Sequence, residues 1–267
     1  MDAQHLSKRL AQVAAFIPTG ARMADIGSDH AYLPAALTLQ GKISFAVAGE
    51  VVAGPYENME KEIKENGLVN QIIPRLADGL AAIKPQDKVD TVVIAGMGGA
   101  LIADILERGK EHLKGVKRLV LQPNVGEYRL RSWLLANHYQ IMAEQLVEED
   151  DHIYEIIVAE PSPVPFSYSY YELMFGPFLL EKKGPIFTSK WQDYVKRQEG
   201  VLTQMANAKQ PPIDRINQLK DRIALVKEAL KWLRGQIWLT DLNNLLVHNW
   251  PKSGTTWGYK LATLTSH

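Results

Sequence analysis

Hydrophobic positions in the first 160 residues fall into short unbroken runs separated by stretches with helical spacing. The runs predict strands at Arg22–Ile26, Ile43–Gly49, Ile72–Leu76, Thr91–Ala95, Arg118–Leu121, Tyr139–Glu148 and Ile153–Ala159. After an opening amphipathic stretch that ends at Pro18, the helical spacing predicts helices at Ala31–Leu39, Tyr56–Asn66, Ala100–His112 and Glu127–Ala136. Apolar strands without alternation are typical of a parallel sheet covered on both faces.

The last two predicted strands break this alternation. Only the four residues 149–152 separate them, which is too short for a crossover helix, so we expect them to pair antiparallel. Five parallel strands followed by such a hairpin resemble the Rossmann-like methyltransferases, in which the last strand inserts antiparallel. Five parallel strands followed by a hairpin are not the strand pattern of a dehydrogenase.

The pattern changes again after the Pro-rich segment 161–165. Apolar positions then recur at alternating steps of three and four, first at Trp191, Val195, Gln198, Leu202 and Met205, then at Ile216, Leu219, Ile223, Val226, Leu230 and Leu233. Two such helices joined at Pro211-Pro212 predict an antiparallel coiled-coil hairpin, with a plain helix pair covering the sheet as the alternative. A monomer is expected, although heptads also allow pairing between chains.

Charge is segregated along the chain, although the formal net charge is zero. Residues 1–180 hold 16 basic and 23 acidic residues, a net charge of −7, whereas residues 181–234 hold 12 basic and 6 acidic residues, a net charge of +6. A basic helical region suits contact with a polyanion, although a solvated helix face could carry the same charges. The sequence contains no cysteine, which excludes thiolate nucleophiles and thiolate metal sites.

No run of 18 uncharged apolar residues occurs, and the first residues lack a signal-peptide pattern. We therefore expect no membrane segment and a cytoplasmic location. No His, Asp or Glu cluster has convincing metal-ligand spacing, so no metal is expected.

The turn after the first predicted strand carries the clearest chemical signal. It reads Asp25-Ile26-Gly27-Ser28-Asp29-His30, with one glycine where a dinucleotide fingerprint would show three; Asp29 and Tyr32 hold the later glycine positions. A single glycine is a poor fit to a pyrophosphate but suffices for a ligand without phosphate, such as S-adenosylmethionine. An ordinary strand–turn–helix corner is the alternative.

Other predicted strands also end in residues suited to ligand binding. Glu50 can accept hydrogen bonds from ribose hydroxyls, and the Asp78-Gly79 turn can bind the exocyclic amine of adenine. Gly96–Gly99 follow the fourth strand and Gln122-Pro123-Asn124 the fifth, although close packing at a helix entry would also explain the glycines. Because parallel strands end at one edge of a sheet, these residues together predict one site.

Four motifs make the resemblance specific. Residues 25–34 (DIGSDHAYLP), 49–55 (GEVVAGP), 94–99 (IAGMGG) and 121–124 (LQPN) closely resemble the bacterial tRNA methyltransferase family that modifies N1 of adenine 22. The resemblance covers roughly residues 5–234 and implies a class I S-adenosylmethionine-dependent enzyme with a helical C-terminal domain that helps to hold tRNA. The expected domains are a catalytic domain at 1–162 and a helical coiled-coil domain at 163–235. Residues 236–267 are expected to form a tail of uncertain order that departs from the family.

These observations assign roles to individual residues. The expected cofactor-binding residues are Asp25, Gly27, Ser28, His30, Glu50, Val51, Asp78, Gly79, Gly96 and Met97. The expected substrate-binding residues are Tyr32, Asn124, Lys190, Lys196 and Arg197. Asp29 is the expected catalytic residue, as a base or as the group that orients adenine, unless it only caps the next helix. The competing functions are an RNA-binding or assembly protein on an inactive methyltransferase fold and an NAD-dependent dehydrogenase.

Overall fold

The computed structural model describes residues 4–232 of the chain. They form two compact units that meet in the sequence between Lys190 and Trp191. The domain limits expected from the sequence, at 162 and 235, stay predictions. The expected tail at 236–267 lies outside the described residues.

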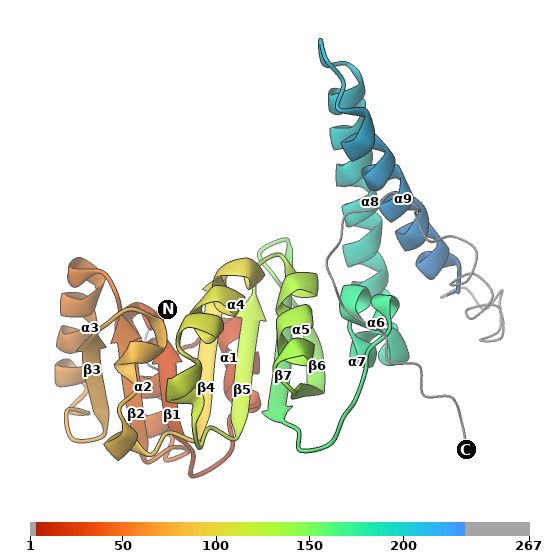
Figure 1. Cartoon of the computed structure of the whole chain (residues 1–267). Coiled ribbons are helices and arrows are strands. Elements are labelled where there is room, and N and C mark those ends of the chain that lie inside the picture. The colour runs from red at the N-terminus through yellow and green to blue at the C-terminus, as the bar shows by residue number, and fades with distance from the viewer. Residues whose placement is uncertain (1–3, 233–267) are drawn as a thin grey trace, which may run out of the picture. The chain divides into compact units, whose positions relative to one another are not determined.

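The first unit contains a seven-stranded sheet in the order β3-β2-β1-β4-β5-β7-β6 (Figure 1). Its strands are β1 (Arg22–Ile26), β2 (Phe45–Glu50), β3 (Ile72–Leu76), β4 (Thr91–Met97), β5 (Arg118–Pro123), β6 (Tyr139–Glu149) and β7 (His152–Pro161). Neighbouring strands among the first five pair parallel, while β7 runs antiparallel to both β5 and β6. The predicted mostly parallel sheet with an antiparallel last strand is confirmed, because β7, the last strand in sequence, inserts between β5 and β6.

Helices follow most of the strands. They are α1 (Lys8–Ala15), α2 (Tyr32–Leu39), α3 (Ala53–Glu65), α4 (Gly99–Arg108), α5 (Glu127–Ala136), α6 (Tyr170–Phe175), α7 (Pro177–Lys182), α8 (Pro185–Ala206) and α9 (Ile213–Trp232). Short 3-10 turns occur at η1 (Asp29–Ala31), η2 (Gly79–Ala82), η3 (Pro85–Asp87) and η4 (Lys110–Leu113).

Two helix predictions were too long. The helix predicted from Ala31 begins at Tyr32, because Ala31 adopts a left-handed backbone conformation. The helix predicted through His112 ends before Gly109, after which η4 follows. A Cβ at Gly109 would lie only 2.5 Å from Leu80 Cβ, so close packing requires glycine where the helix stops.

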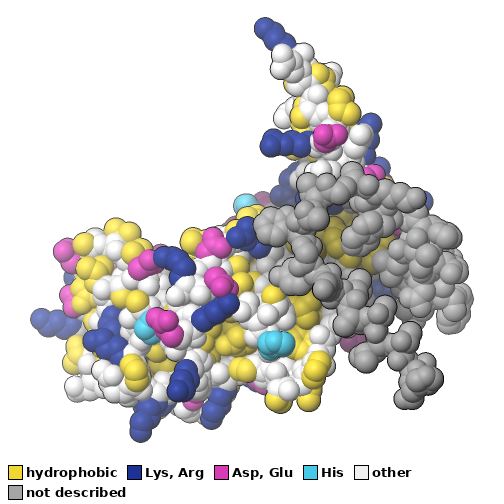
Figure 2. Space-filling view, viewed as in Figure 1, with side chains coloured by type: hydrophobic (Ala, Val, Ile, Leu, Met, Phe, Trp, Pro, Cys, Tyr) yellow, Lys and Arg dark blue, Asp and Glu magenta, His cyan; other side chains and the backbone are white. Residues whose placement is uncertain are grey.

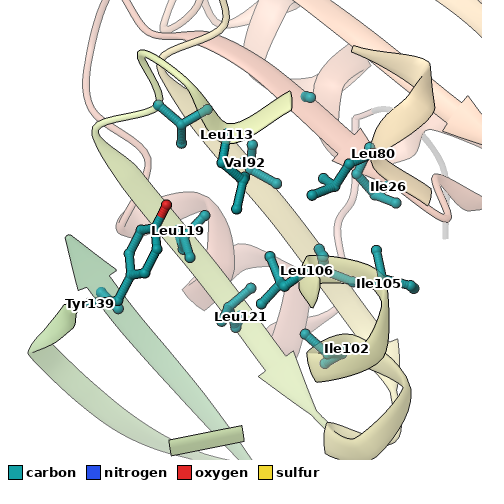
Figure 3. Packing of buried hydrophobic residues seen from close by; sticks show 14 of the residues in the cluster. Ile26, Leu80, Val92, Ile102, Ile105, Leu106, Leu113, Leu119, Leu121 and Tyr139 are labelled. Carbon is teal, nitrogen blue, oxygen red and sulfur yellow. The ribbon is translucent and has the colours of Figure 1, made fainter. Parts of the chain in front are cut away.

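Both faces of the sheet are covered, as the apolar strands predicted. Apolar residues of α1, α2 and α3 pack on one face, and those of η2, α4 and α5 pack on the other; Figure 1 shows α4 in front of the sheet and α1 behind it. Because successive strand residues point to opposite faces, Ile94 and Leu121 face α4, while Val93 and Val120 face the other layer. Figure 3 shows Leu106 of α4 beside Leu121.

A buried ion cluster joins α5, β6, β7 and the second turn of α8. The guanidinium of Arg131, fully buried, contacts Glu144 Oε1 at 2.7 Å through Nε and Glu155 through Nη2. Lys190 Nζ bridges Glu155 and Glu127. Burial opposes the charge on Arg131, but Glu155 and Glu144 outweigh it and raise its pKa. Burial raises the pKa of Glu144, although Arg131 partly offsets this. The sequence did not reveal this cluster.

Gly176 packs directly against the ion cluster. Its φ is +89°, and a Cβ there would lie 2.6 Å from Glu144 Oε2 and 2.8 Å from Arg131 Nη2. Two residues later, the backbone N–H of Phe178 donates to Glu144 Oε2 at 3.0 Å. The turn between α6 and α7 is therefore fixed directly against buried charges.

The second unit contains most of α8 and the whole of α9. The heptad positions from Trp191 to Met205 and from Ile216 to Leu230 are buried or half-buried, and Leu233 lies outside the described residues. Lys227 of α9 pairs with Glu199 of α8, Nζ to Oε1 at 2.6 Å. The predicted helices are present, while coiled-coil geometry stays a prediction. Within residues 4–232, no helix is long and apolar enough to cross a membrane.

Candidate active site

The carboxyl ends of the parallel strands meet at one edge of the sheet. Ile26 ends β1 opposite Gly49 of β2 and Ile94 of β4, and Glu50 ends β2 opposite Leu76 of β3. The turns that follow the first five strands therefore lie in a row along this edge. Open α/β sheets bind their ligands there.

Gly27 makes the turn after β1 possible. Its φ is +72°, and the backbone N–H groups of Gly27 and Ser28 both donate to the carbonyl of Gly49, at 2.9 and 3.0 Å. A Cβ at Gly27 would lie 2.2 Å from Cε of Met97, the last residue of β4. The site therefore requires glycine both for its backbone conformation and for space.

Asp25 and Ser28 form a buried pair beneath this turn. Their exposed fractions are 7% and 2%, and Ser28 Oγ donates to Asp25 Oδ2 at 2.5 Å. Burial raises the pKa of Asp25 to about 6, although the bond from Ser28 works in the opposite direction. A cationic ligand group beside this carboxylate would stabilise its ionised form.

The η1 turn presents Asp29 to solvent. His30 and Ala31 both have a φ of +54°, a left-handed conformation that is costly for residues other than glycine. The Asp29 side chain is 76% exposed, with Oδ1 3.6 Å from His30 Nε2, and the rings of His30 and Tyr32 stack at 5.1 Å with planes 8° apart. Asp29 caps neither η1 nor α2 through its side chain.

Strain of this kind clusters at functional sites. The conformation of η1 therefore favours a chemical role for Asp29 over the alternative in which Asp29 only caps the following helix.

Glu50 and Asp78, the two acidic residues expected to bind the adenosine part of the cofactor, have different surroundings. Oε1 of half-buried Glu50 accepts from the backbone N–H groups of Val51 and Val52, at 2.8 and 2.9 Å. Asp78 is 60% exposed and pairs with Arg108 of α4, Oδ2 to Nη1 at 2.6 Å. Both carboxylates keep acceptor capacity, because each oxygen has two lone pairs.

Glycines support the neighbouring turns. Gly79 has a φ of +55°, and a Cβ there would lie 3.0 Å from Ile105 Cγ2. A Cβ at Gly99 would lie 2.4 Å from the carbonyl oxygen of Gly126, so close packing at the entry to α4 explains Gly99 without a ligand.

Gly96 forms a bulge at the end of β4. The register between β4 and β5 shifts between Ala95 and Met97, and Gly96 has a φ of +80°. Its N–H donates to Gln122 Oε1 at 3.0 Å, and Asn124 Nδ2 donates to its carbonyl at 2.8 Å. Bulges often occur beside active sites, where they redirect the chain.

Arg9 of α1 is a residue of this edge that sequence reasoning missed. It donates to Gln122 Oε1 through Nη1, across 113 positions of sequence. Its place in the opening amphipathic helix gives no chemical signal, so only the fold reveals the contact.

The basic residues expected to bind RNA fall into two classes. Lys190 is 13% exposed and engaged by Glu127 and Glu155. Lys196 and Arg197 are exposed on α8, and Figure 2 shows Lys and Arg side chains on the helical unit. In residues 191–231, the exposed basic residues are Lys196, Arg197, Lys209, Arg215, Lys220, Arg222, Lys227 and Lys231. Within the described part of the chain, no three His, Asp or Glu residues gather as a metal site would require.

The chain is similar to known proteins over most of its length. The family model described as TrmK, tRNA (adenine(22)-N(1))-methyltransferase, matches residues 23–228. The tRNA (adenine(22)-N(1))-methyltransferase of Bacillus subtilis is 41% identical over 236 residues, which cover 86% of this chain and 99% of that protein.

The chain is also similar to solved structures of proteins described as TrmK or as tRNA (m1A22) methyltransferases. A Streptococcus pneumoniae protein in complex with S-adenosyl-L-methionine is 44% identical with a TM-score of 0.77, covering 85% of this chain and all of that one. TrmK of M. capricolum, in complex with S-adenosyl-homocysteine, is 27% identical with a TM-score of 0.74, covering 85% of this chain and 98% of that one. Together with the strand-end site, these matches establish that the chain belongs to the tRNA (adenine(22)-N(1))-methyltransferase family.

Proposed function

We propose that this chain transfers a methyl group from S-adenosylmethionine to N1 of adenine 22 in tRNA, and that Asp29 is its catalytic residue. The observation that carries the assignment of Asp29 is the strained η1 turn, which holds this exposed carboxylate two residues after Gly27. Family membership supplies the reaction, and the residues at the sheet edge supply its machinery.

The strand-end residues fit the cofactor. Buried Asp25, with its raised pKa, suits a cationic amino group. Gly27 gives the turn its left-handed backbone and leaves room for the Met97 side chain. Glu50 can accept hydrogen bonds from the ribose hydroxyls of the cofactor, and Asp78 can accept one from its adenine amine. The rest of the proposed cofactor-binding set is Ser28, His30, Val51, Gly79, Gly96 and Met97. When bound, S-adenosylmethionine supplies the electrophilic methyl group.

The reaction needs no covalent intermediate with the enzyme. Adenine N1 carries its own lone pair, and the chain contains no cysteine that could serve as a nucleophile. The residues must extract the base, orient N1 and tolerate the positive charge that develops on the ring. Asp29 accepts a hydrogen bond from the N6 amine and stabilises that charge, or takes a proton from it; such a role contributes about 10²- to 10⁴-fold in rate.

The stacked rings of His30 and Tyr32 extend the site toward the base. Their planes are nearly parallel, and the two side chains are partly exposed. A flipped adenine can add to such a stack, because every base offers an aromatic face. We assign Tyr32 to this contact and Asn124 to the edge of the base.

The exposed basic residues of α8 and α9 support contact with tRNA phosphates. Lys196 and Arg197 belong to this proposed surface. Lys190 is left out of it, because its ammonium group is held between two carboxylates. The burial of heptad positions within one chain supports a monomer, and a tRNA substrate supports a cytoplasmic location.

Substitution of Asp29 tests the catalytic assignment. Asp29→Asn is expected to lower kcat by about 10²-fold or more, while the dissociation constant for S-adenosylmethionine stays within a few-fold. Methyl incorporation into unmodified tRNA, with the product nucleotide mapped by mass spectrometry, measures the first quantity, and calorimetry measures the second. Asp104→Asn, which alters an exposed carboxylate of α4, is the matched control. Near-normal turnover by Asp29→Asn would disprove the catalytic role.

A further inference from the structure

We propose that Arg9 and Gln122 are positioning residues that hold the Gly96 bulge and fix the Asn124 amide so that it offers an N–H group to the target adenine. The inference rests on the proposed methylation of adenine. It assigns a role to α1, which contributes no residue to the site expected from the sequence.

Side chains, rather than strand pairing, hold the peptide groups of Gly96. Its N–H donates to Gln122 Oε1, and its carbonyl accepts from Asn124 Nδ2. Gln122 Nε2 also donates to Asn124 Oδ1 at 3.1 Å, which closes a ring of hydrogen bonds. Gln122 is fully buried, so this ring has little competition from water.

The partners in this ring fix the orientation of both amides. A backbone N–H and a guanidinium can only donate, so the atom of Gln122 that faces Gly96 and Arg9 must be its oxygen. The Gln122 nitrogen therefore faces Asn124, which must present its own oxygen in return. The Asn124 nitrogen then faces the carbonyl of Gly96. Reversal of either amide would place donors against donors.

Arg9 is itself firmly held. Its backbone N–H donates to Glu149 Oε1 at 3.2 Å, and its guanidinium lies 5.2 Å from the ring centroid of Tyr154. The Nη1 atom that reaches Gln122 would also lie 3.5 Å from a Cβ at Gly96. The guanidinium thus covers the bulge from the side of α1 and supplies a charge-assisted hydrogen bond to the ring.

The consequence for recognition concerns the exposed side chain of Asn124. One of its two N–H groups bonds to Gly96, and the other makes no hydrogen bond to residues 4–232. Adenine has three ring acceptors, and because N1 receives the methyl group, an N–H donor suits N3 or N7. Asp29, in the η1 turn that follows β1, can accept a hydrogen bond from the N6 amine, so the two residues present complementary groups to one base.

A double-mutant cycle tests whether Arg9 acts through Asn124. Asn124→Ala and Arg9→Ala are each expected to lower kcat roughly 10-fold, with little change in the affinity for S-adenosylmethionine. The double variant should be no slower than the slower single variant, because coupled residues are not additive. Arg9→Lys keeps a cationic donor and should be faster than Arg9→Ala. If Arg9→Ala does not fold, Arg9→Lys takes its place in the cycle.

Lys8→Ala is the matched control. It removes a positive charge from the preceding position of α1, where Lys8 Nζ donates to the carbonyl of Glu148, and it should be additive with Asn124→Ala. If Arg9 instead binds a tRNA phosphate, Arg9→Ala will raise KM for tRNA, reduce the salt dependence by about one phosphate contact and combine additively with Asn124→Ala. That result overturns the positioning role.

The same assay separates this inference from the proposed function. If the wild type and Lys8→Ala methylate adenine and the Arg9 and Asn124 effects are independent, only the inference fails. If the wild type itself does not methylate adenine, the proposed function fails and the inference fails with it.

Discussion

Replacement of Arg131 by methionine would leave two buried carboxylates without the cation that they share. Glu144 and Glu155 are each 1% exposed, and Arg131 contacts both. Lys190 would still neutralise Glu155. Among the described residues, Glu144 would keep only the N–H of Phe178 as a partner, so most of the cost falls on Glu144.

The size of the effect follows from burial. Removing one partner of a buried ion pair costs about 3–5 kcal/mol, because the remaining charge has lost its solvent and its counterion. Whole domains are stable by only about 5–15 kcal/mol, so Arg131→Met should remove a large share of the stability of the first unit. For a domain of this size, the melting temperature should fall by roughly 10 °C.

The loss should also depend on pH. Burial raises the pKa of Glu144, and removal of Arg131 removes the interaction that opposes this rise. A carboxyl group whose pKa is higher in the folded state binds a proton on folding. The variant should therefore lose stability as the pH rises from roughly 4 through the raised pKa, and its deficit relative to the wild type should shrink at low pH.

Thermal and urea unfolding of the whole chain at pH 5 and pH 8 would measure the stability lost by Arg131→Met and its dependence on pH. Arg129→Met is the matched control, since Arg129 lies on the same helix in an exposed pair with Asp104 and should cost less than about 1 kcal/mol. Arg131→Met combined with Glu144→Met should regain stability, because the unpaired charge is gone. The reasoning would be refuted if Arg131→Met lowered the free energy of unfolding by less than about 1 kcal/mol, or by the same amount at both pH values.

Other predictions concern ligands. Gly27→Ala should weaken S-adenosylmethionine binding at least about 10-fold in calorimetry through backbone strain and a clash, whereas Gly67→Ala, with a similar φ of +70° but open space, should leave it unchanged. Wild-type affinity for the cofactor should rise as the pH passes about 6, because Asp25 ionises there. The free energy of unfolding should fall as the pH rises from about 4 to about 6, because folded Asp25 holds its proton more tightly than the unfolded chain does. Asp25→Asn should abolish both trends. Lys196→Glu with Arg197→Glu should weaken tRNA binding and flatten its salt dependence, and an unchanged binding curve would exclude these residues from the interface.

Local patterns in the sequence determined much of the sheet. The bounds of β1 and β3 match the predicted strands, and the short link between β6 and β7 correctly predicted an antiparallel pair. These features depend on neighbouring residues, because an unbroken apolar run and the length of a loop are both set within a few positions. The helix limits depended on tertiary packing at Gly109 and on the left-handed backbone at Ala31, so they were predicted less well.

The sequence by itself also determined the family and the strand ends that carry the candidate site, because the relevant motifs are contiguous and each follows a strand. Only the tertiary structure revealed that Arg9 reaches Gln122 and that Arg131 lies between two glutamates. Such contacts join residues that local propensity does not relate. Their geometry is set by the packing of helices on the sheet, and this packing brings charges together where no sequence spacing predicts a pair.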